Sequence, residues 1–212
     1  MITIKAFEFN YFQENTFVLY DDTKEAVIID CGCLRPSEEK ELSDFITENK
    51  LTVKHLLCTH LHLDHIFGNP FIYKTYGLSP QAHRLDVEQL PAPDKQAQAF
   101  GLPGHFQEIP VQKQLVGNEV VKFGHSELLV LTVPGHSPGS VAFYNKKNGF
   151  AIVGDALFAR SIGRTDLWGG NQEVLIAAIN DKLLSLPDET VIYPGHGPET
   201  RVIDEKLNNP YL

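Results

Sequence analysis

The first thirty positions of the chain contain apolar-rich runs typical of β-strands. Three such runs cover residues 3–9, 15–20 and 26–30, and Asp21-Asp22 is a turn between the last two. Turn residues between such runs are typical of strands that pair in order along the chain. The pattern therefore predicts a meander of three strands that begins one sheet.

A helix and a further strand are predicted next. Leu42 and Ile46 recur with helical spacing between Pro36, which opens the helix, and Asn49, which ends it. Residues 53–58 are an apolar run of strand type. Polar residues that follow this run should lie at the carboxyl end of a strand, where α/β sheets place their ligands.

Further elements follow in the same order through the rest of the chain. In the first half, the pattern predicts a short helix over 66–76, ended by Gly77, and a short strand over 79–82. In the second half it predicts a helix over 172–184 and strands over 119–123, 128–133, 141–144, 150–153 and 190–193. Two strand-rich halves, each closed by helices, predict an α/β fold: a four-layer αββα sandwich with functional residues along one edge.

Residues 84–110 interrupt this regular order. Several prolines and glycines break any long element there, and apolar residues such as Phe100 and Phe106 lie among them. A loop of this length inside a compact domain is commonly functional or disordered. We therefore predict an irregular flap that walls one side of a substrate cleft.

Composition and charge narrow the class of protein. With 212 residues, of which 42% are hydrophobic, the chain can bury a proper core, and we interpret residues 1–212 as one domain. The formal net charge of −9, without a basic cluster, disfavours a nucleic-acid partner. The sequence has no pattern of a signal peptide or a membrane span, so we expect a cytoplasmic monomer or homodimer without a membrane partner.

The three cysteines are too few, and odd in number, for a disulfide framework. The spacing Cys31-Gly32-Cys33 could serve a metal or a redox pair, but small buried thiols beside an apolar strand are the simpler interpretation. Cys58 is interpreted in the same way.

The densest chemistry lies directly after the strand at 53–58. Within six residues the chain carries His60, His62, Asp64 and His65. So many polar groups are costly to bury unless a metal ion binds them. The alternation of the chain would point the first two histidines one way and the other two residues toward a neighbouring point, which predicts two adjacent metals. Because a zinc-type site takes three protein ligands and an open water position, distant donors are also required.

Three distant segments supply such donors. His136 and His196 each lie in a Pro-Gly-His turn, and Asp155 follows the apolar run at 151–154. The other histidines lie outside this pattern and are interpreted as capping or surface residues: His55, His83, His105 and His125.

The seven donors, in their order along the chain, resemble the metal signature of the metallo-β-lactamase fold superfamily: His60, His62, Asp64, His65, His136, Asp155 and His196. The segment Gly-Arg-Thr-Asp at 163–166 and the Pro-Gly-His turns resemble glyoxalase II-like hydrolases, especially their short forms. The resemblance extends from residue 2 to about residue 200.

The resemblance implies a role for each donor and for the metals. One ion would be held by His60, His62 and His136, and the other by Asp64, His65 and His196. Asp155 would bridge the two ions, and Asp64 and Asp155 would be the catalytic carboxylates. The cofactor would be two divalent metal ions, with zinc as the first choice and iron or manganese as alternatives.

The same resemblance implies hydrolysis of a small-molecule thioester, such as S-lactoylglutathione, by a metal-bound hydroxide. Full-length relatives hold the glutathione carboxylates with a C-terminal helical domain. This sequence ends at Leu212, soon after the last donor, so we expect no such domain and weak selectivity for glutathione. Arg160 and Arg164 are candidate substrate contacts, although Arg164 could instead pair with Asp166.

Two other functions stay open. A persulfide dioxygenase would use one iron held by His60, His136 and Asp155, which leaves positions free for O₂ and a thiolate. A non-catalytic metal-binding domain is the lesser alternative, since no donor has been lost. The resemblance also places Asp30 near the floor of the metal site as a hydrogen-bond partner, and a simple turn residue is the alternative interpretation.

Overall fold

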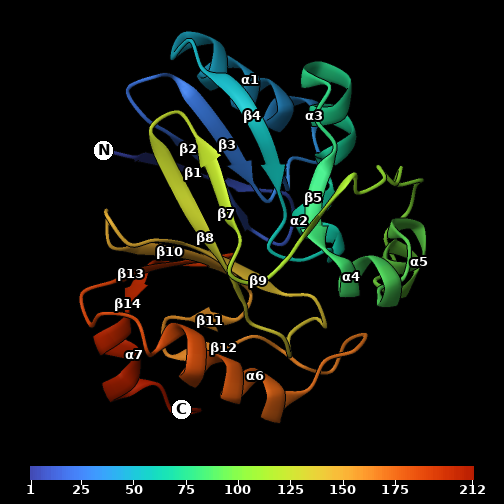
Figure 1. Ribbon diagram of the computed structural model, residues 1–212. Helices are drawn as coiled ribbons and strands as arrows, with labels where there is room; N and C mark the ends of the chain where they lie inside the picture. The colour runs from blue at the N-terminus through green and yellow to red at the C-terminus, as the bar shows by residue number, and fades with distance from the viewer.

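Two six-stranded sheets pack between helices in the computed structural model, which describes all residues 1–212 (Figure 1). In the first sheet the strands follow one another in the order β1-β2-β3-β4-β5-β6. They are β1 (Thr3–Phe9), β2 (Glu14–Tyr20), β3 (Glu25–Ile29), β4 (Thr52–Leu57), β5 (Pro80–His83) and β6 (Lys113–Leu115). The first three pair antiparallel and form the predicted meander, and β4, β5 and β6 continue it in parallel.

The second sheet has the order β14-β13-β10-β9-β8-β7. Its strands are β7 (Val120–Phe123), β8 (Ser126–Thr132), β9 (Val141–Asn145), β10 (Phe150–Gly154), β13 (Val191–Pro194) and β14 (Thr200–Arg201). Only β10 and β13 pair in parallel, so their carboxyl ends meet at the same edge. The strands predicted for the second half are confirmed.

Helices form the two outer layers. α1 (Pro36–Glu48) and α3 (Asn69–Tyr76) lie on the outer side of the first sheet, and α6 (Gln172–Ala178) and α7 (Val202–Asn208) lie on the outer side of the second (Figure 1). A π-helical turn, Ile179–Leu183, extends α6. The four-layer αββα sandwich is therefore confirmed. None of its helices has the length and apolar character needed to cross a membrane.

Burial on both faces explains why the inner strands are apolar at nearly every position. In β3, Val27 and Ile29 belong to the core between the two sheets, whereas Ala26 and Ile28 pack under α1 against Leu42. A strand covered on both sides needs apolar residues at every position rather than at every second one. Full burial of one such aliphatic side chain contributes about 1.5–3 kcal/mol.

The helix predicted over 66–76 is two short helices. α2 (Leu63–Ile66) ends before Gly68, and α3 begins directly after it. A Cβ atom at Gly68 would lie 2.4 Å from the sulfur of Cys33 and 2.5 Å from that of Cys31, so glycine lets the chain pass close to the two thiols. All three cysteines are free and buried, as the sequence indicated.

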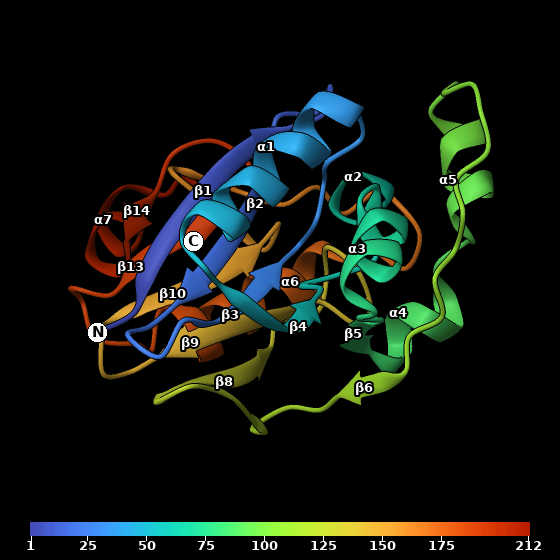
Figure 2. The ribbon, with the colours of Figure 1, turned by 90° about the horizontal axis from the view of Figure 1, so that it is seen from above.

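The prediction of an irregular flap over 84–110 is wrong in its first half, where α4 (Arg84–Gln89) and α5 (Pro93–Ala99) form. Pro93 occupies the first position of α5, where a missing N–H costs no helical hydrogen bond. Prolines therefore bound helices here instead of preventing them. Figure 2 shows α4 and α5 on the same side of the sandwich as α2 and α3.

Candidate metal centre

The seven donors lie where strands of both sheets end. His60 and His62 follow β4, Asp64 and His65 are in α2, and the turn after β8 carries the next histidine. The last two donors follow the parallel strands β10 and β13: Asp155 and His196. The sequence placed the whole first cluster on a loop, but its second half is helical, which lets neighbouring residues point to one side.

Backbone hydrogen bonds join the two sheets at this edge. The Val141 N–H donates to the Thr59 carbonyl at 2.8 Å, and the Asn15 N–H donates to the Gly195 carbonyl at 2.7 Å. Gly195 must be small, because a Cβ atom there would lie 2.3 Å from Asp155 Oδ1. The donors are thus brought together by direct contact between the halves of the chain.

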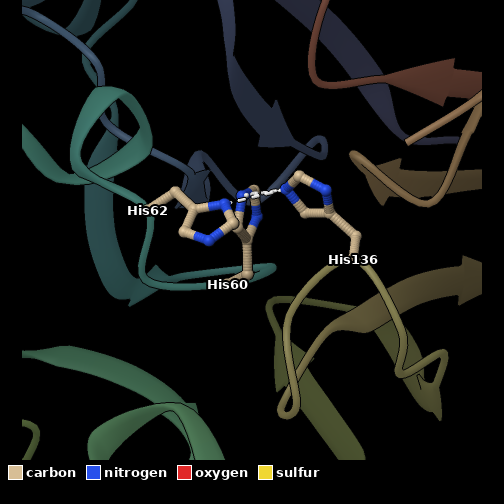
Figure 3. Close-up of side chains that lie close together, drawn as sticks. All are labelled: His60, His62 and His136. Atoms are coloured by element: carbon tan, nitrogen blue, oxygen red, sulfur yellow. Dashed lines mark hydrogen bonds between the residues drawn. The ribbon is translucent and has the colours of Figure 1, made fainter. Parts of the chain in front are cut away.

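The donors fall into two groups of three. His60, His62 and His136 each offer one nitrogen, and these atoms all lie within 4.8 Å of one another. Figure 3 shows the three rings converging from the segment after β4 and the turn after β8. The second group, with the same spacing, is Asp64, His65 and His196. These are the two sets that the sequence comparison with the family implied.

Asp155 lies between the two groups. Its Oδ1 is 3.4 Å from His65 Nε2, and its Oδ2 is 3.7 Å from His136 Nε2 and 3.5 Å from His196 Nε2. One carboxylate therefore faces a member of each group. Its Oδ1 and the Nε2 atom of His65 are buried without a hydrogen-bond partner.

Hydrogen bonds on the far side of the first group leave lone pairs facing inward. His60 Nδ1–H donates to the Thr59 hydroxyl at 3.0 Å, because that hydroxyl itself donates to Asp30. His136 Nδ1–H donates to the Arg164 carbonyl at 2.8 Å. The two Nε2 atoms, 3.2 Å apart, therefore both carry lone pairs. His62 Nδ1 lies 2.8 Å from His136 Nε2, so nitrogens of all three rings converge on one point, where a cation would suit them.

The atoms of the second group also converge on one point. His196 Nδ1–H donates to the Phe12 carbonyl at 3.0 Å, which leaves its Nε2 facing Asp64 Oδ2 at 3.2 Å. His65 Nδ1–H donates to Asp30 Oδ2 at 3.0 Å. The Nε2 atom of His65 lies 3.7 Å from Asp64 Oδ2 and 3.4 Å from Asp155 Oδ1. Carboxylates and imidazole nitrogens that converge in this way are suited to a divalent cation once the rings are neutral. The cluster as a whole fits a dinuclear metal centre.

Asp30 lies one layer below the donors. Its oxygens accept hydrogen bonds from the Thr59 N–H and hydroxyl, both at 2.7 Å, and from His65. Asp30 is thus the hydrogen-bond partner that the family resemblance implied, and it is more than a turn residue. Its role is to fix the tautomer and orientation of a ring above it.

The electrostatic setting differs between the two groups. Burial lowers the pKa of His60 well below its ordinary value and that of His62 to about 3, so both rings are neutral at pH 7. Burial also lowers the pKa of His65, but the carboxylates of Asp155 and Asp64 outweigh it and raise this pKa well above the ordinary value. Burial lowers the pKa of His196 too, but the hydrogen bond to Asp64 and the charge of Asp155 outweigh it and raise this pKa above its ordinary value.

We therefore expect metal binding to release protons at neutral pH, because His65 and His196, whose pKa values are raised, must be neutral to become ligands. The affinity for Zn²⁺ should rise with pH until both rings are neutral. Calorimetric titration of metal-free protein with Zn²⁺, in buffers of different ionisation enthalpy, gives the proton count. The variant His125→Ala, which removes an exposed histidine, should give the same count, and a count of zero in the native protein would contradict the expectation.

Sequence reasoning missed Asp86, a fully buried acid at the start of α4. One of its oxygens accepts hydrogen bonds from the Leu61 N–H at 3.0 Å and from the Ser137 hydroxyl at 2.9 Å, and the other accepts from the Gly139 N–H. Burial raises the pKa of Asp86 to about 6, although these three hydrogen bonds act to lower it. The Asp86 carboxylate thus hydrogen-bonds both to the segment of His60 and His62 and to the turn that carries His136.

Gln96 of α5 acts on the same segment. Its Oε1 accepts from the Leu63 N–H at 3.0 Å, and its Nε2 donates to the Leu61 carbonyl at 2.9 Å. We name Asp86 and Gln96 together the α4–α5 clamp. Their polar character gave no sequence signal, because both belong to the stretch that was interpreted as an irregular flap.

A cavity of about 190 Å³ opens onto the donors and is lined in part by Phe12, Phe100 and Arg164. Phe100 belongs to the stretch 84–110, which therefore does contribute a wall to the cavity. The Arg164 side chain donates two hydrogen bonds to Asp166, at 2.7 and 2.8 Å, so the pairing alternative is observed. Arg160 is exposed at the turn between β11 (Leu157–Phe158) and β12 (Ser161–Ile162) and does not line the cavity.

The remaining histidines lie apart from the donors, as the sequence indicated. His83 caps α4 by accepting a hydrogen bond from the Leu85 N–H at 3.3 Å. The others contact residues outside the cluster: His55, His105 and His125. A larger cavity of about 890 Å³ is lined by His125 and by none of the seven donors. The position of the donors, and not the volume of a cavity, therefore identifies the candidate site.

The fold and the donor set are those of a known family. The model of the metallo-beta-lactamase superfamily matches residues 10–196, and the chain belongs to this superfamily. This is a superfamily of metal-dependent hydrolases, and the histidine and aspartate cluster of the chain fits two metal ions.

Relatives of known sequence are similar over almost the whole chain. The chain is 38% identical to hydroxyacylglutathione hydrolase GloC of Haemophilus influenzae, over 95% of this chain and 93% of the relative. It is 36% identical to the probable metallo-hydrolase YqgX of Bacillus subtilis, over 94% and 92%.

Solved structures agree in fold. The B3 metallo-beta-lactamase BLEG-1 superposes with a TM-score of 0.88 at 35% identity, covering 99% of both chains. TTHA1623, in a di-iron-bound form, gives 0.86 at 34% identity, covering 98% of this chain and 100% of the other. ETHE1 from Myxococcus xanthus gives 0.79 at 26% identity, covering 98% and 83%.

Proposed function

We propose that this protein is a dinuclear metal hydrolase that cleaves small-molecule thioesters, of which hydroxyacyl thioesters of glutathione are one example. The observation that carries the proposal is Asp155, a single carboxylate that faces both groups of three donors. Similarity to GloC supports the thioester substrate. We further propose that residues 1–212 act as one domain.

In this proposal each group would hold one ion, with zinc as the ion, and Asp155 would be available to both. The ions would be bound by His60, His62 and His136, and by Asp64, His65 and His196. Two divalent cations bound there would lower the pKa of a coordinated water and offset negative charge on the substrate oxygen.

The residues of the chain supply orientation and proton transfer. Asp30, Thr59 and the Phe12 carbonyl fix three of the imidazole rings through their Nδ1–H groups. Burial raises the pKa of Asp64, but His65 and His196 bring it below its ordinary value, so the carboxylate is ionised at neutral pH. Asp64 lines the cavity and can accept the proton of an attacking water and return it to the leaving thiolate.

A persulfide dioxygenase is the second candidate. A mononuclear site would use His60, His136 and Asp155. His136 Nε2 lies 3.2 Å from His60 Nε2 and 3.7 Å from Asp155 Oδ2, and the likeness to ETHE1 supports this candidate. The second set of three donors, Asp64, His65 and His196, favours the hydrolase, because a single iron would leave these three side chains without a metal.

We expect protein of known metal content to hydrolyse S-lactoylglutathione with a high KM and a measurable kcat. The reason is that the donors act on the reacting carbonyl, whereas the one cationic residue that lines the cavity, Arg164, is already paired with Asp166. Thioester hydrolysis and oxygen uptake with glutathione persulfide should be assayed side by side, with metal analysis of the same sample. Oxygen uptake by iron-loaded protein without thioester cleavage would establish the dioxygenase instead.

A further inference from the structure

Four aromatic side chains form a continuous chain of contacts over the metal centre. Phe12 lies between Phe67 and Phe100, with ring centroids 6.4 and 6.1 Å away, and Phe100 lies 6.0 Å from Trp168. Trp168 in turn lies 6.2 Å from the ring of His62. We name Phe67, Phe12, Phe100 and Trp168 the aromatic arc.

The members of the arc come from separate parts of the chain. Phe12 is in the turn between β1 and β2, Phe67 lies between α2 and α3, Phe100 follows α5, and Trp168 lies in the segment before α6. No local pattern brings them together. Tertiary contacts place them at one rim, where Phe12 and Phe100 line the cavity that opens onto the donors.

The arc exposes apolar surface next to a reactive site. Phe12 and Phe100 each keep 38% of their surface exposed, although the neighbouring cluster of Leu63, Phe67 and Ala97 is buried. Adjacent exposed aromatic rings beside a cavity with polar donors are typical of a ligand-binding surface. Since aromatic rings gain most from other flat apolar groups, the arc is suited to such a group on the ligand.

The charges in the cavity also favour an apolar group on the ligand. Among the residues that line it, the fixed cation is Arg164, and both of its hydrogen bonds go to Asp166. A carboxylate on the substrate would compete with this pair. An apolar group would meet Phe12, Phe100, Leu63 and Leu167 without such competition.

We propose that the aromatic arc is the specificity surface of the enzyme and binds a planar apolar group beside the thioester, so that aryl and arylalkyl thioesters are the preferred substrate class. The inference rests on the proposed thioester hydrolysis. In that reaction water adds its oxygen to the acyl carbon, the C–S bond breaks, and a carboxylate, a thiol and a proton are released.

Four thioesters test the preference and locate the group: acetyl and phenylacetyl esters of N-acetylcysteamine, and the same two esters of benzyl mercaptan. We expect kcat/KM of at least one aromatic ester to exceed that of the small ester by about tenfold. The position of the ring in the better substrate, acyl or thiol, says which side of the thioester faces the arc. Phe100→Ala should remove most of this advantage, while Phe100→Leu should restore part of it.

Tyr73→Ala is the matched control, because Tyr73 is an exposed aromatic residue of α3 outside the cavity. A second readout needs no turnover. Trp168 is the one tryptophan of the chain, so its fluorescence reports directly on the arc. Phenylacetate or benzyl mercaptan should quench it in metal-free protein, acetate should not, and Phe100→Ala should weaken the quenching.

The outcomes separate this inference from the proposed function. If metal-loaded protein hydrolyses none of the thioesters, the proposed function fails. If it hydrolyses all of them with similar kcat/KM, and Phe100→Ala lowers each to the same extent, the specificity surface alone is refuted. Fluorescence that does not respond to any aromatic product would refute it as well.

Discussion

Asp155→Ala should remove metal from both sites and lower turnover roughly a thousandfold or more. Asp155 is the one carboxylate that lies within 3.7 Å of His65, His136 and His196. Two unit charges 4 Å apart repel by about 4 kcal/mol at an effective dielectric constant of 20, and divalent ions repel more strongly. Without a carboxylate between them, the two ions would lose the group that offsets this repulsion.

Metal analysis by plasma mass spectrometry, together with the thioester assay, measures both effects. His83→Ala is the control, because His83 caps α4 and lies outside the cluster, so metal content and turnover should stay near those of the native protein. An Asp155→Ala protein with two bound metals and native turnover would refute the bridging role.

Asp86→Ala should destabilise the fold and weaken catalysis, although Asp86 lies behind the donors. The substitution leaves the N–H groups of Leu61 and Gly139 without their acceptor, and the Ser137 hydroxyl keeps only its contact with the Ser140 hydroxyl at 2.8 Å. Each buried polar group left unpaired costs about 1–3 kcal/mol, so the free energy of unfolding should fall by about 3 kcal/mol or more. Because the segment of His60 and His62 loses its support, kcat should fall more than KM rises.

Urea unfolding and steady-state kinetics on metal-saturated protein measure the two effects separately. Asp86→Asn keeps the size of the side chain and one acceptor oxygen, and we expect it to recover part of the stability. Glu88→Ala, an exposed acid of the same helix, is the matched control and should change neither quantity. If Asp86→Ala loses stability but keeps native kcat, the clamp is structural only and does not position the donors.

Periodicity determined most of the fold from the sequence. The meander, α1 and the paired strands of the second half follow from short apolar runs and, in α1, from apolar residues that recur every three to four positions, and the structure confirms them. The same signal failed where elements are too short to show a period. β6, the β11–β12 hairpin and α7 escaped notice, and α4 and α5 were taken for a loop because prolines bound them.

The seven donors could be named from the sequence because each residue type is uncommon in a core without a ligand and each follows a recognisable strand or turn. The structure alone decided which nitrogen of His65 and of His136 faces inward, since their Nδ1–H groups donate to Asp30 and to the Arg164 carbonyl, partners in distant parts of the chain. The contacts of the α4–α5 clamp and of the aromatic arc are likewise known only from the tertiary structure. Their members are joined by contacts between segments tens of residues apart, and local spacing carries no information about such contacts.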